Sequence, residues 1–343
     1  MTIFLVLLIL CFWASLKGIN RAQMWWLSFF LAVILGFRGK DVGDDTARYI
    51  SYFNSVDVKD GTGYMEIGWS WFSDFIKSIG FSAYFFNFLV ACITLSCFVY
   101  VISKTISNNK FWGSALFVLY SCGFYLYMFN GMRQFLAISI VFLAFHLAIN
   151  NKNIWAAVLI LFASLFHTSA ICGLFIFLVK HIKLTNTTII SALVASLLIG
   201  YLLIEKVVYY FAGGYARLVS EYGFRKSVAY VIIVCGLTNV FYVWLYNLHS
   251  SKRNDGWMKV FFASVVLMNL LCNVTMGPRL VFFYSTAQII VLSYYMITFQ
   301  KNQIVRSVIY IYSFITFFRF LLPELYRTEE GLLPYYMTFS IFE

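Results

Sequence analysis

Charged residues are scarce in this chain of 343 residues: Asp, Glu, Lys and Arg together make up 11%, whereas a typical soluble domain carries about 25%. Proline is also rare, with three residues. The seven cysteines lie in or beside apolar stretches and form no Cys-x-x-Cys pair, which excludes a secreted disulfide scaffold. The shortage of charge excludes a soluble fold, and the same composition excludes intrinsic disorder.

Apolar and aromatic residues are abundant instead. They amount to 62% and 21% of the chain, and the mean hydropathy is +0.82. The apolar stretches are continuous rather than alternating, which is typical of membrane-spanning helices and not of an outer-membrane barrel. They cover roughly residues 2–16, 24–37, 83–103, 111–129, 132–149, 154–179, 187–205, 227–247, 259–275, 280–298 and 307–322. The sequence therefore predicts an all-α polytopic membrane protein.

The stretch 154–179 is too long for one ordinary crossing, since a core of about 30 Å needs about 20 residues. Its middle carries His167, Thr168 and Ser169. We interpret it as a broken helical hairpin, in which two short helices meet near His167. A broken helix at membrane depth is tolerated only where it lines a cavity or is buried in protein. This gives about twelve membrane segments in one integral membrane domain, 1–343, with outer loops at 38–82 and 206–226 and with both termini outside.

The net charge of +11 follows from this topology. Twelve basic residues and one acidic residue fall on the inner face, and thirteen of each sign fall on the outer face. Such an excess of Lys and Arg is the positive-inside signal of membrane proteins. Contact with membrane lipid accounts for it, and no nucleic acid is expected as a partner, because the basic residues do not gather in one patch.

The outer loop 38–82 gathers the first candidate site residues. Carboxylates accept hydrogen bonds from sugar hydroxyls, aromatic rings cover the apolar face of a sugar, and arginine suits phosphate. A solvated loop whose charges pair with one another remains the alternative. The aspartates match no calcium loop, and we expect neither a metal nor another cofactor. The candidates are Arg38, Asp44, Asp45, Tyr49, Tyr52 and Glu66.

Three further candidates stand on separate apolar stretches. Arg133 and Arg279 lie at the outer ends of their stretches, and His167 lies at the expected break. Charged groups near membrane depth cost about 2.5–3.5 kcal/mol each on insertion scales and are usually functional or paired. The alternatives are snorkelling of either arginine to the interface and a histidine whose hydrogen bonds are satisfied inside the bundle. Four histidines this far apart make no zinc site.

The pattern of these residues resembles the EpsG/Wzy-like polysaccharide polymerases of bacterial inner membranes. Gly43, Asp45 and Tyr49 are spaced as GxDxxxY, Glu66 and Gly68 follow as ExG, Arg133 precedes Ala137, and 166–170 reads Phe-His-Thr-Ser-Ala. The resemblance covers roughly residues 36–172. Beyond residue 180 the resemblance rests mostly on the general pattern of apolar residues, together with Arg279.

The resemblance implies a glycosyltransferase of GT-C-like architecture. Such a polymerase joins oligosaccharide repeat units carried on undecaprenyl diphosphate, at a site facing the periplasm or the outside, and a chain-length regulator protein is a possible partner. Arg133, Arg279 and Arg38 would hold the diphosphate. His167 or one carboxylate among Asp44, Asp45 and Glu66 would take the hydroxyl proton. Tyr49 and Tyr52 would contact sugar.

Two other functions fit part of the pattern. A flippase of the lipid-linked repeat unit would also use broken helices and a cationic cavity. A ligase that moves finished glycan to another acceptor would share most of the polymerase chemistry. The candidate groups collect on one side of the membrane and the sequence has no evident inverted repeat, so a polymerase is favoured over a transporter.

Overall fold

The computed structural model describes residues 1–55, 65–202, 231–249, 255–274, 277–326 and 331–342, so the expected outer loop 206–226 lies outside the described residues. Over these residues the regular structure is helical, and β-pairing is limited to isolated bridges. The prediction of an all-helical chain is confirmed for them. In chain order the elements are α1 (Thr2–Lys17), α2 (Arg21–Gly36), α3 (Thr46–Asn54), α4 (Ile67–Ser78), α5 (Ala83–Thr105), η1 (Asn109–Phe111), α6 (Trp112–Ser121), α7 (Phe124–Tyr127), α8 (Met132–Ile149), α9 (Asn153–Ser164), η2 (Thr168–Phe175), α10 (Ile176–Val179), α11 (Asn186–Leu202), η4 (Val231–Gly236), α15 (Leu237–Leu248), α16 (Gly256–Leu270), α17 (Gly277–Ser285), α18 (Ala287–Thr298), α19 (Gln303–Leu321) and η6 (Leu322–Tyr326).

In the part of the chain that the structure describes, four helical segments are long and apolar enough to cross a membrane: Ala83–Thr105, Met132–Ile149, Arg279–Thr298 and Gln303–Glu324. Further apolar helices have 10–17 residues. At 1.5 Å per residue these shorter helices reach about 15–26 Å, less than the full thickness of a hydrocarbon core. The number of membrane segments therefore stays a prediction.

The chain breaks where the sequence predicted a break. Helix α9 ends at Ser164 and η2 begins at Thr168, so that His167 lies in the connection between them. The two ends of the segment meet, because Lys180 Nζ donates to Asn153 Oδ1 at 2.6 Å and to the carbonyl oxygen of Ala148 at 3.4 Å. The segment leaves this point and returns to it, which is a hairpin with His167 at its tip.

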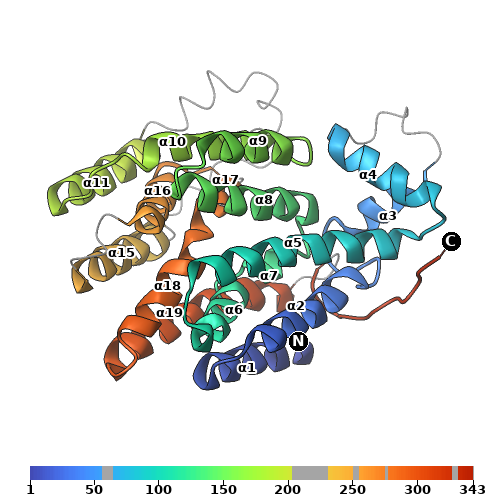
Figure 1. The fold of residues 1–343 in the computed structure, drawn as a ribbon, viewed down its shortest axis with the longest axis horizontal. Helices are drawn as coiled ribbons and strands as arrows, with labels where there is room; N and C mark the ends of the chain where they lie inside the picture. The colour runs from blue at the N-terminus through green and yellow to red at the C-terminus, as the bar shows by residue number, and fades with distance from the viewer. Residues whose placement is uncertain (56–64, 203–230, 250–254, 275–276, 327–330, 343) are drawn as a thin grey trace. The chain divides into compact units, whose positions relative to one another are not determined.

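The contacts divide the chain into two compact units. Their segments can be followed by residue number in Figure 1. Unit 1 comprises Met1–Leu147, Ile154–Ile171 and Gln288–Glu343, and unit 2 comprises Ala148–Asn153 and Cys172–Ala287.

Within unit 1, small residues let helices approach closely, as at many membrane helix crossings. A Cβ atom on Gly113 of α6 would stand 2.1 Å from the carbonyl oxygen of Ala14 in α1. Next to this contact the hydroxyl groups of Ser15 and Ser114 lie 3.0 Å apart. A Cβ atom on Gly36 of α2 would meet the backbone of Phe88 in α5 at 2.2 Å. Helices α1 and α2 thus pack on α6 and α5 through backbone contact.

Unit 2 is built around α16, which packs against α11 and α17. A small residue also permits the close crossing of α11 and α16, because a Cβ atom on Gly200 would lie 2.0 Å from the carbonyl oxygen of Asn269. The Asn269 amide also donates to the carbonyl oxygen of Leu193 at 3.2 Å and to Ser196 Oγ at 3.1 Å. The crossing therefore combines close packing with hydrogen bonds between the helices.

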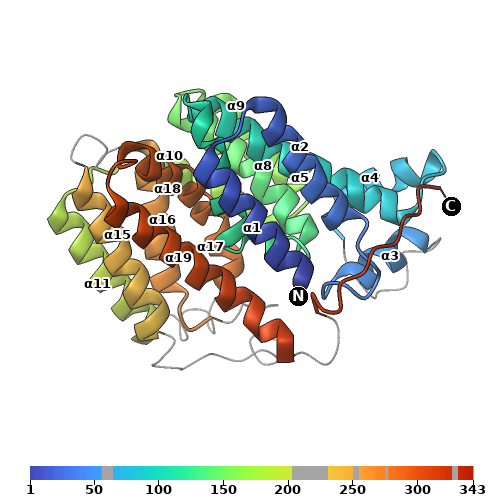
Figure 2. The ribbon, with the colours of Figure 1, turned by 90° about the horizontal axis from the view of Figure 1, so that it is seen from below.

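The end of the chain runs as an extended segment, the C-terminal strap (residues 331–342), past the end of α2 toward the start of α5 (Figure 2). Gly39 N donates to the carbonyl oxygen of Tyr336 at 2.9 Å, and Thr338 N donates to that of Phe37 at 2.8 Å. Ser82 N donates to the carbonyl oxygen of Ile341 at 3.0 Å. The strap thus holds both ends of the loop that carries α3 and α4.

The packing at Gly113 predicts the effect of one added methyl group. Gly113→Ala should destabilise the protein by about 1–3 kcal/mol, because the methyl would push α1 away from α6. Gly236→Ala is the matched control: that glycine has helical backbone angles, and no atom of the described residues lies within 4 Å of its Cβ position. The measurement is thermal unfolding of the purified protein in detergent. Equal melting temperatures for the two variants would contradict the close crossing.

Candidate functional site

Three segments far apart in the sequence meet at the carboxylate of Glu66. Glu66 precedes α4, Arg133 lies in the first turn of α8, and His167 is at the hairpin tip. Arg133 Nη1 donates to Glu66 Oε2, and His167 Nδ1 lies 3.0 Å from Oε1. The exposed fraction is 12% for the Glu66 side chain, 15% for Arg133 and 27% for His167. Solvent therefore reaches this centre mainly beside His167. All three residues belong to unit 1.

The surroundings keep Glu66 ionised. Burial by itself would raise the pKa of its carboxyl, but the hydrogen bond from His167 and the charge of Arg133 outweigh burial and bring the pKa below its usual value. The backbone N–H of Thr168 adds a weak donor at 3.4 Å from Oε1. Because an ionised carboxylate can only accept, Nδ1 of His167 is the protonated nitrogen in this contact. Whenever the ring is neutral, its Nε2 therefore carries no proton.

Gly68 explains how α4 reaches the hairpin. Its N–H donates to the carbonyl oxygen of Leu165 at 2.8 Å, and a Cβ atom on Gly68 would also lie 2.8 Å from that oxygen. Any larger residue would push the start of α4 away from the tip. The ExG spacing therefore has a mechanical reason: the glycine permits the approach that lets Glu66 contact His167.

Tyr49 links this centre to Asp45. The guanidinium carbon of Arg133 lies 5.6 Å from the centre of the buried Tyr49 ring, within cation–π range, and the Tyr49 hydroxyl donates to Asp45 Oδ2 at 3.3 Å. Trp69 packs on the same ring, with ring centres 5.2 Å apart. Burial raises the pKa of Tyr49 to about 12, so the phenol stays neutral. A ring covered in this way offers no open face to a sugar, and we propose a positioning role for Tyr49 in place of the expected sugar contact.

Tyr52, Asp44 and Asp45, the candidates in and just before α3, also take part in internal contacts. The Tyr52 hydroxyl and Ser70 Oγ lie 2.7 Å apart and join α3 to α4. Asp44 is half-buried in the turn before α3, where its backbone N–H donates to Asn130 Oδ1 at 3.2 Å. Asp45 occupies the N-cap position of α3. Asp44 and Asp45 thus lie beside the residues that lead into α8, and their chemical roles stay predictions.

Arg38 is completely buried. Its Nε donates to Thr46 Oγ1 at 2.8 Å, its Nη1 to the carbonyl oxygen of Leu35 at 2.6 Å and its Nη2 to that of Phe129 at 3.2 Å. Burial lowers the pKa of Arg38 to about 10, so it remains charged at neutral pH. Because all three nitrogens are engaged inside the protein, we propose that Arg38 holds the loop to the start of α8 rather than contacting a diphosphate.

The C-terminal strap secures the same loop from its other side, which the sequence did not indicate. The Tyr336 hydroxyl donates to Asp41 Oδ2 at 2.6 Å, and the Tyr335 hydroxyl donates to the carbonyl oxygen of Ile34 at 2.8 Å. A Cβ atom on Gly39 would overlap the Tyr336 ring at 1.9 Å. In the sequence this tail looks like an ordinary outer terminus, and no motif marks its partners.

Arg279 lies in unit 2, in the first turn of α17, and is exposed. Its expected role beside Arg133 stays a prediction.

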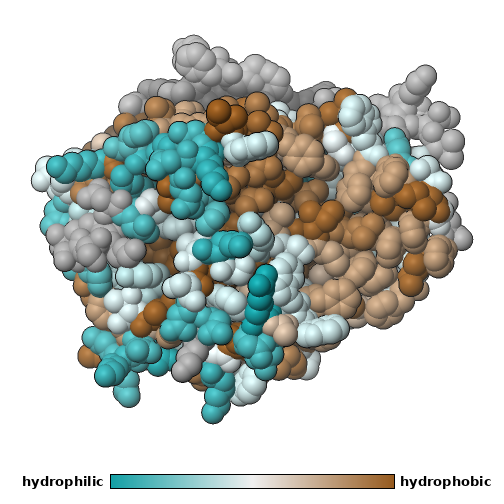
Figure 3. Space-filling model, viewed as in Figure 1, coloured by the Kyte–Doolittle hydropathy of each residue, from teal (hydrophilic) through white to brown (hydrophobic). Residues whose placement is uncertain are grey.

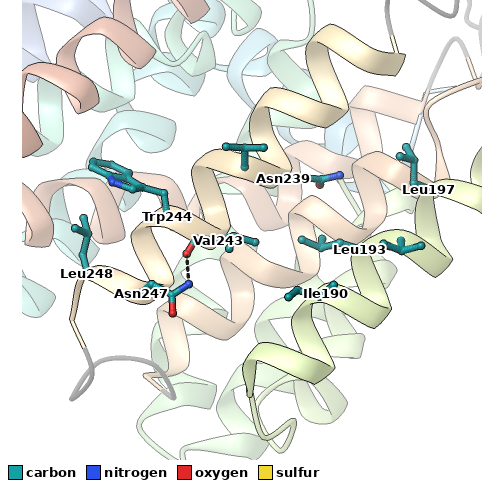
Figure 4. A pocket seen from close by; sticks show the side chains of 10 residues that line it. Ile190, Leu193, Leu197, Asn239, Val243, Trp244, Asn247 and Leu248 are labelled. Atoms are coloured by element: carbon teal, nitrogen blue, oxygen red, sulfur yellow. Dashed lines mark hydrogen bonds between the residues drawn. The ribbon is translucent and has the colours of Figure 1, made fainter.

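Unit 2 also contains an apolar groove of about 620 Å³ between α11 and α15 (Figure 4). Leu193 and Leu197 line one side, and Val243 and Trp244 line the other. Asn247 is among its few polar side chains, and its amide donates to the carbonyl oxygen of Val243 at 2.9 Å. None of the candidate site residues lines this groove.

The lowered pKa of Glu66 predicts a pH-dependent contribution to stability. Because the folded pKa lies below the unfolded value of about 4.3, the stabilisation is complete above that value and is lost as the pH falls through the folded pKa. The difference in melting temperature between wild type and Glu66→Gln should be largest at pH 6–7 and shrink below about pH 4. Asp74→Asn, at an exposed carboxylate of α4, is the control. A difference for Glu66→Gln that is independent of pH would contradict the ion pairing.

Comparison with known proteins adds an independent finding. The sequence model of the EpsG family matches residues 21–337, which is most of the chain and includes every candidate residue described above. No curated protein and no solved structure matches the chain. The match agrees with the resemblance seen over roughly residues 36–172 and also covers the residues of unit 2. This chain belongs to the EpsG family.

Proposed function

We propose that this protein is a polysaccharide polymerase that joins oligosaccharide repeat units carried on undecaprenyl diphosphate. Membership in the EpsG family indicates a polymerase-like, glycosyltransferase-like membrane protein of polysaccharide biosynthesis. The finer parts of the proposal are the lipid-linked donor and acceptor, a site that faces the periplasm or the outside of a bacterial inner membrane, twelve membrane segments, a GT-C-like architecture and a chain-length regulator as partner.

The observation that carries the proposal is the contact of Glu66 with both Arg133 and His167. It joins a cation and an imidazole on one carboxylate. The topology proposed from the sequence orients these helix ends outward. A diphosphate is a good leaving group, so such a site needs cations for the leaving group and a base for the attacking hydroxyl more than it needs a strong acid.

His167 is the base in this proposal. A hydroxyl oxygen of the acceptor sugar forms a bond to the anomeric carbon of the donor chain, while the bond from that carbon to the diphosphate oxygen breaks and its electron pair leaves with the diphosphate. The hydroxyl proton goes to His167 Nε2. Glu66 accepts the hydrogen bond from Nδ1, fixes the tautomer and stabilises the imidazolium that forms, as a carboxylate does in other carboxylate–histidine pairs.

Arg133 has donors left for the diphosphate. A guanidinium has five N–H groups. In Arg133, Nη1 donates a hydrogen bond to Glu66 Oε2. Arg133 Nε is buried and has no hydrogen-bond partner among the described residues. Because Arg133 also rests on the Tyr49 ring, its plane is held in place before a ligand arrives. Arg279 is the proposed second cation.

The direct test uses purified protein in lipid nanodiscs with synthetic undecaprenyl-diphosphate repeat units and no nucleotide sugar. Wild type should produce a ladder of products. His167→Gln and Glu66→Gln should each slow polymerisation at least about 100-fold, the usual contribution of a general base, and Arg133→Ala should abolish the ladder.

Arg48→Ala is the matched control, because Arg48 is an exposed arginine of the same outer loop and should be dispensable. All variants are compared at equal folded amounts. A wild type that forms no ladder but moves a fluorescent lipid-linked repeat unit across a liposome membrane would overturn the proposal in favour of a flippase. Transfer of finished glycan to a different acceptor, without a ladder, would identify a ligase.

A further inference from the structure

Helix α4 exposes a narrow apolar stripe. Ile67, Trp71, Phe75 and Ile79 are 51%, 68%, 60% and 52% exposed, and they follow one another at intervals of four residues. Residues four apart lie on one side of a helix. The stripe therefore runs along the whole length of α4, from the residue after Glu66 to the residue after the helix ends.

The remaining faces of α4 are occupied. Trp69 and Ile76 are buried against the protein. Lys77 turns back to α3, where its Nζ donates to the carbonyl oxygens of Phe53 at 3.0 Å and Asn54 at 3.3 Å. Asp74 is exposed at the edge of the stripe. The one cation of the helix is thus engaged away from the apolar stripe.

Contacts with α5 fix the position of α4 along the direction perpendicular to the membrane. Phe86, in the first turns of a helix that is long and apolar enough to cross a membrane, packs on Trp69 and Phe72 with ring centres 4.9 and 5.2 Å apart. The start of a membrane-spanning helix lies near the border between hydrocarbon and headgroups. Helix α4 is therefore held at this border, and its 12 residues, about 18 Å long, are too few to cross.

The apolar surface continues beyond α4. The ring of Phe342 stacks on Phe81, with centres 5.4 Å apart, and Phe339 packs on Phe37 at 5.1 Å, yet both rings of the strap remain about two-thirds exposed. Figure 3 shows apolar side chains gathered over the region where Figure 1 places α4 and the start of α5. The stripe is thus continuous with the surface around a membrane-spanning helix.

We infer that α4 is an interfacial helix. It inserts the stripe Ile67–Trp71–Phe75–Ile79 into the lipid at the outward-facing surface of the membrane that the protein spans, and it thereby supports Glu66. The four side chains expose on the order of 450 Å², below the roughly 800 Å² per partner of a stable protein interface. Tryptophan and phenylalanine beside an apolar face suit the headgroup boundary. Because no free cation lines the described stripe, we expect apolar burial to dominate, with little dependence on anionic lipid.

The test reads the depth of Trp71 directly. Full-length protein is reconstituted in phosphatidylcholine bilayers brominated at acyl carbons 6 and 7 or at carbons 11 and 12, and the tryptophan emission of wild type is compared with that of Trp71→Phe. The difference between the two emission spectra is the emission of Trp71. This emission should be blue-shifted relative to tryptophan in water. It should be quenched more by the shallow bromines at carbons 6 and 7 than by the deep ones at carbons 11 and 12. Adding phosphatidylglycerol should leave the quenching unchanged.

Two variants check the direction of the stripe. In the Trp71→Phe background, Phe75→Trp should restore quenching by shallow bromines, whereas Asp74→Trp, at the polar edge, should restore much less. A Trp71 signal typical of water, without quenching, would overturn the inference. So would a Trp71 shielded from all bromines together with a dimer that Trp71→Ser/Phe75→Ser converts to a monomer.

The link to Glu66 rests on the proposed function and is tested separately. Trp71→Ser/Phe75→Ser should lower the polymerisation rate several-fold in bilayers, and Asp74→Asn should not. An unchanged rate would refute the support of Glu66 by lipid contact. If wild type forms no polymer, the proposed function fails, but the quenching result still decides whether α4 lies in the interface.

Discussion

The carboxylate of Glu66 is the interaction on which the rest of the site depends. It is half-buried, and an ion in such a place is stable only with partners. Arg133 supplies the opposite charge, His167 supplies a hydrogen bond, and the three come from a loop, a long apolar helix and the tip of a hairpin. Removing either partner leaves a poorly solvated carboxylate. The outer loop, α8 and the hairpin are therefore held together by one charged centre.

The rest of the outer loop serves to hold this centre in place. Arg38, fully buried, binds the loop to Phe129, close to the start of α8. Tyr336 in the C-terminal strap binds it from the other side through Gly39 and Asp41. Gly68 removes the side chain that would separate α4 from the hairpin tip. Backbone contacts and buried polar groups position this loop, and its lipid-facing stripe adds a further support.

The sequence predicted much of the fold, because the apolar stretches and the break near His167 are local properties of composition and length. It also identified Glu66 among the carboxylates of the outer loop, and Arg133 and His167 as charged or titratable groups near membrane depth, which need partners. It did not predict which of them would pair, because pairing depends on how distant segments pack. For the same reason Arg38 and Tyr49 were assigned to ligands: an arginine or tyrosine has the same sequence pattern whether it faces a substrate or the interior. The Tyr336 hydroxyl and its partner Asp41 are 295 residues apart in the sequence, and no local pattern encodes such a contact.

The central claim is that Glu66 and His167 act as one unit. A double-mutant cycle on the polymerisation rate tests it most directly, with Glu66→Gln, His167→Gln and the double variant measured beside wild type in the same bilayers. If Glu66 acts on the proton transfer through the His167 ring, the double variant should be much faster than the product of the two single losses predicts, because the effect of the carboxylate on the imidazole is already absent in His167→Gln. Losses that multiply, so that each substitution acts at full strength in the presence of the other, would contradict the account.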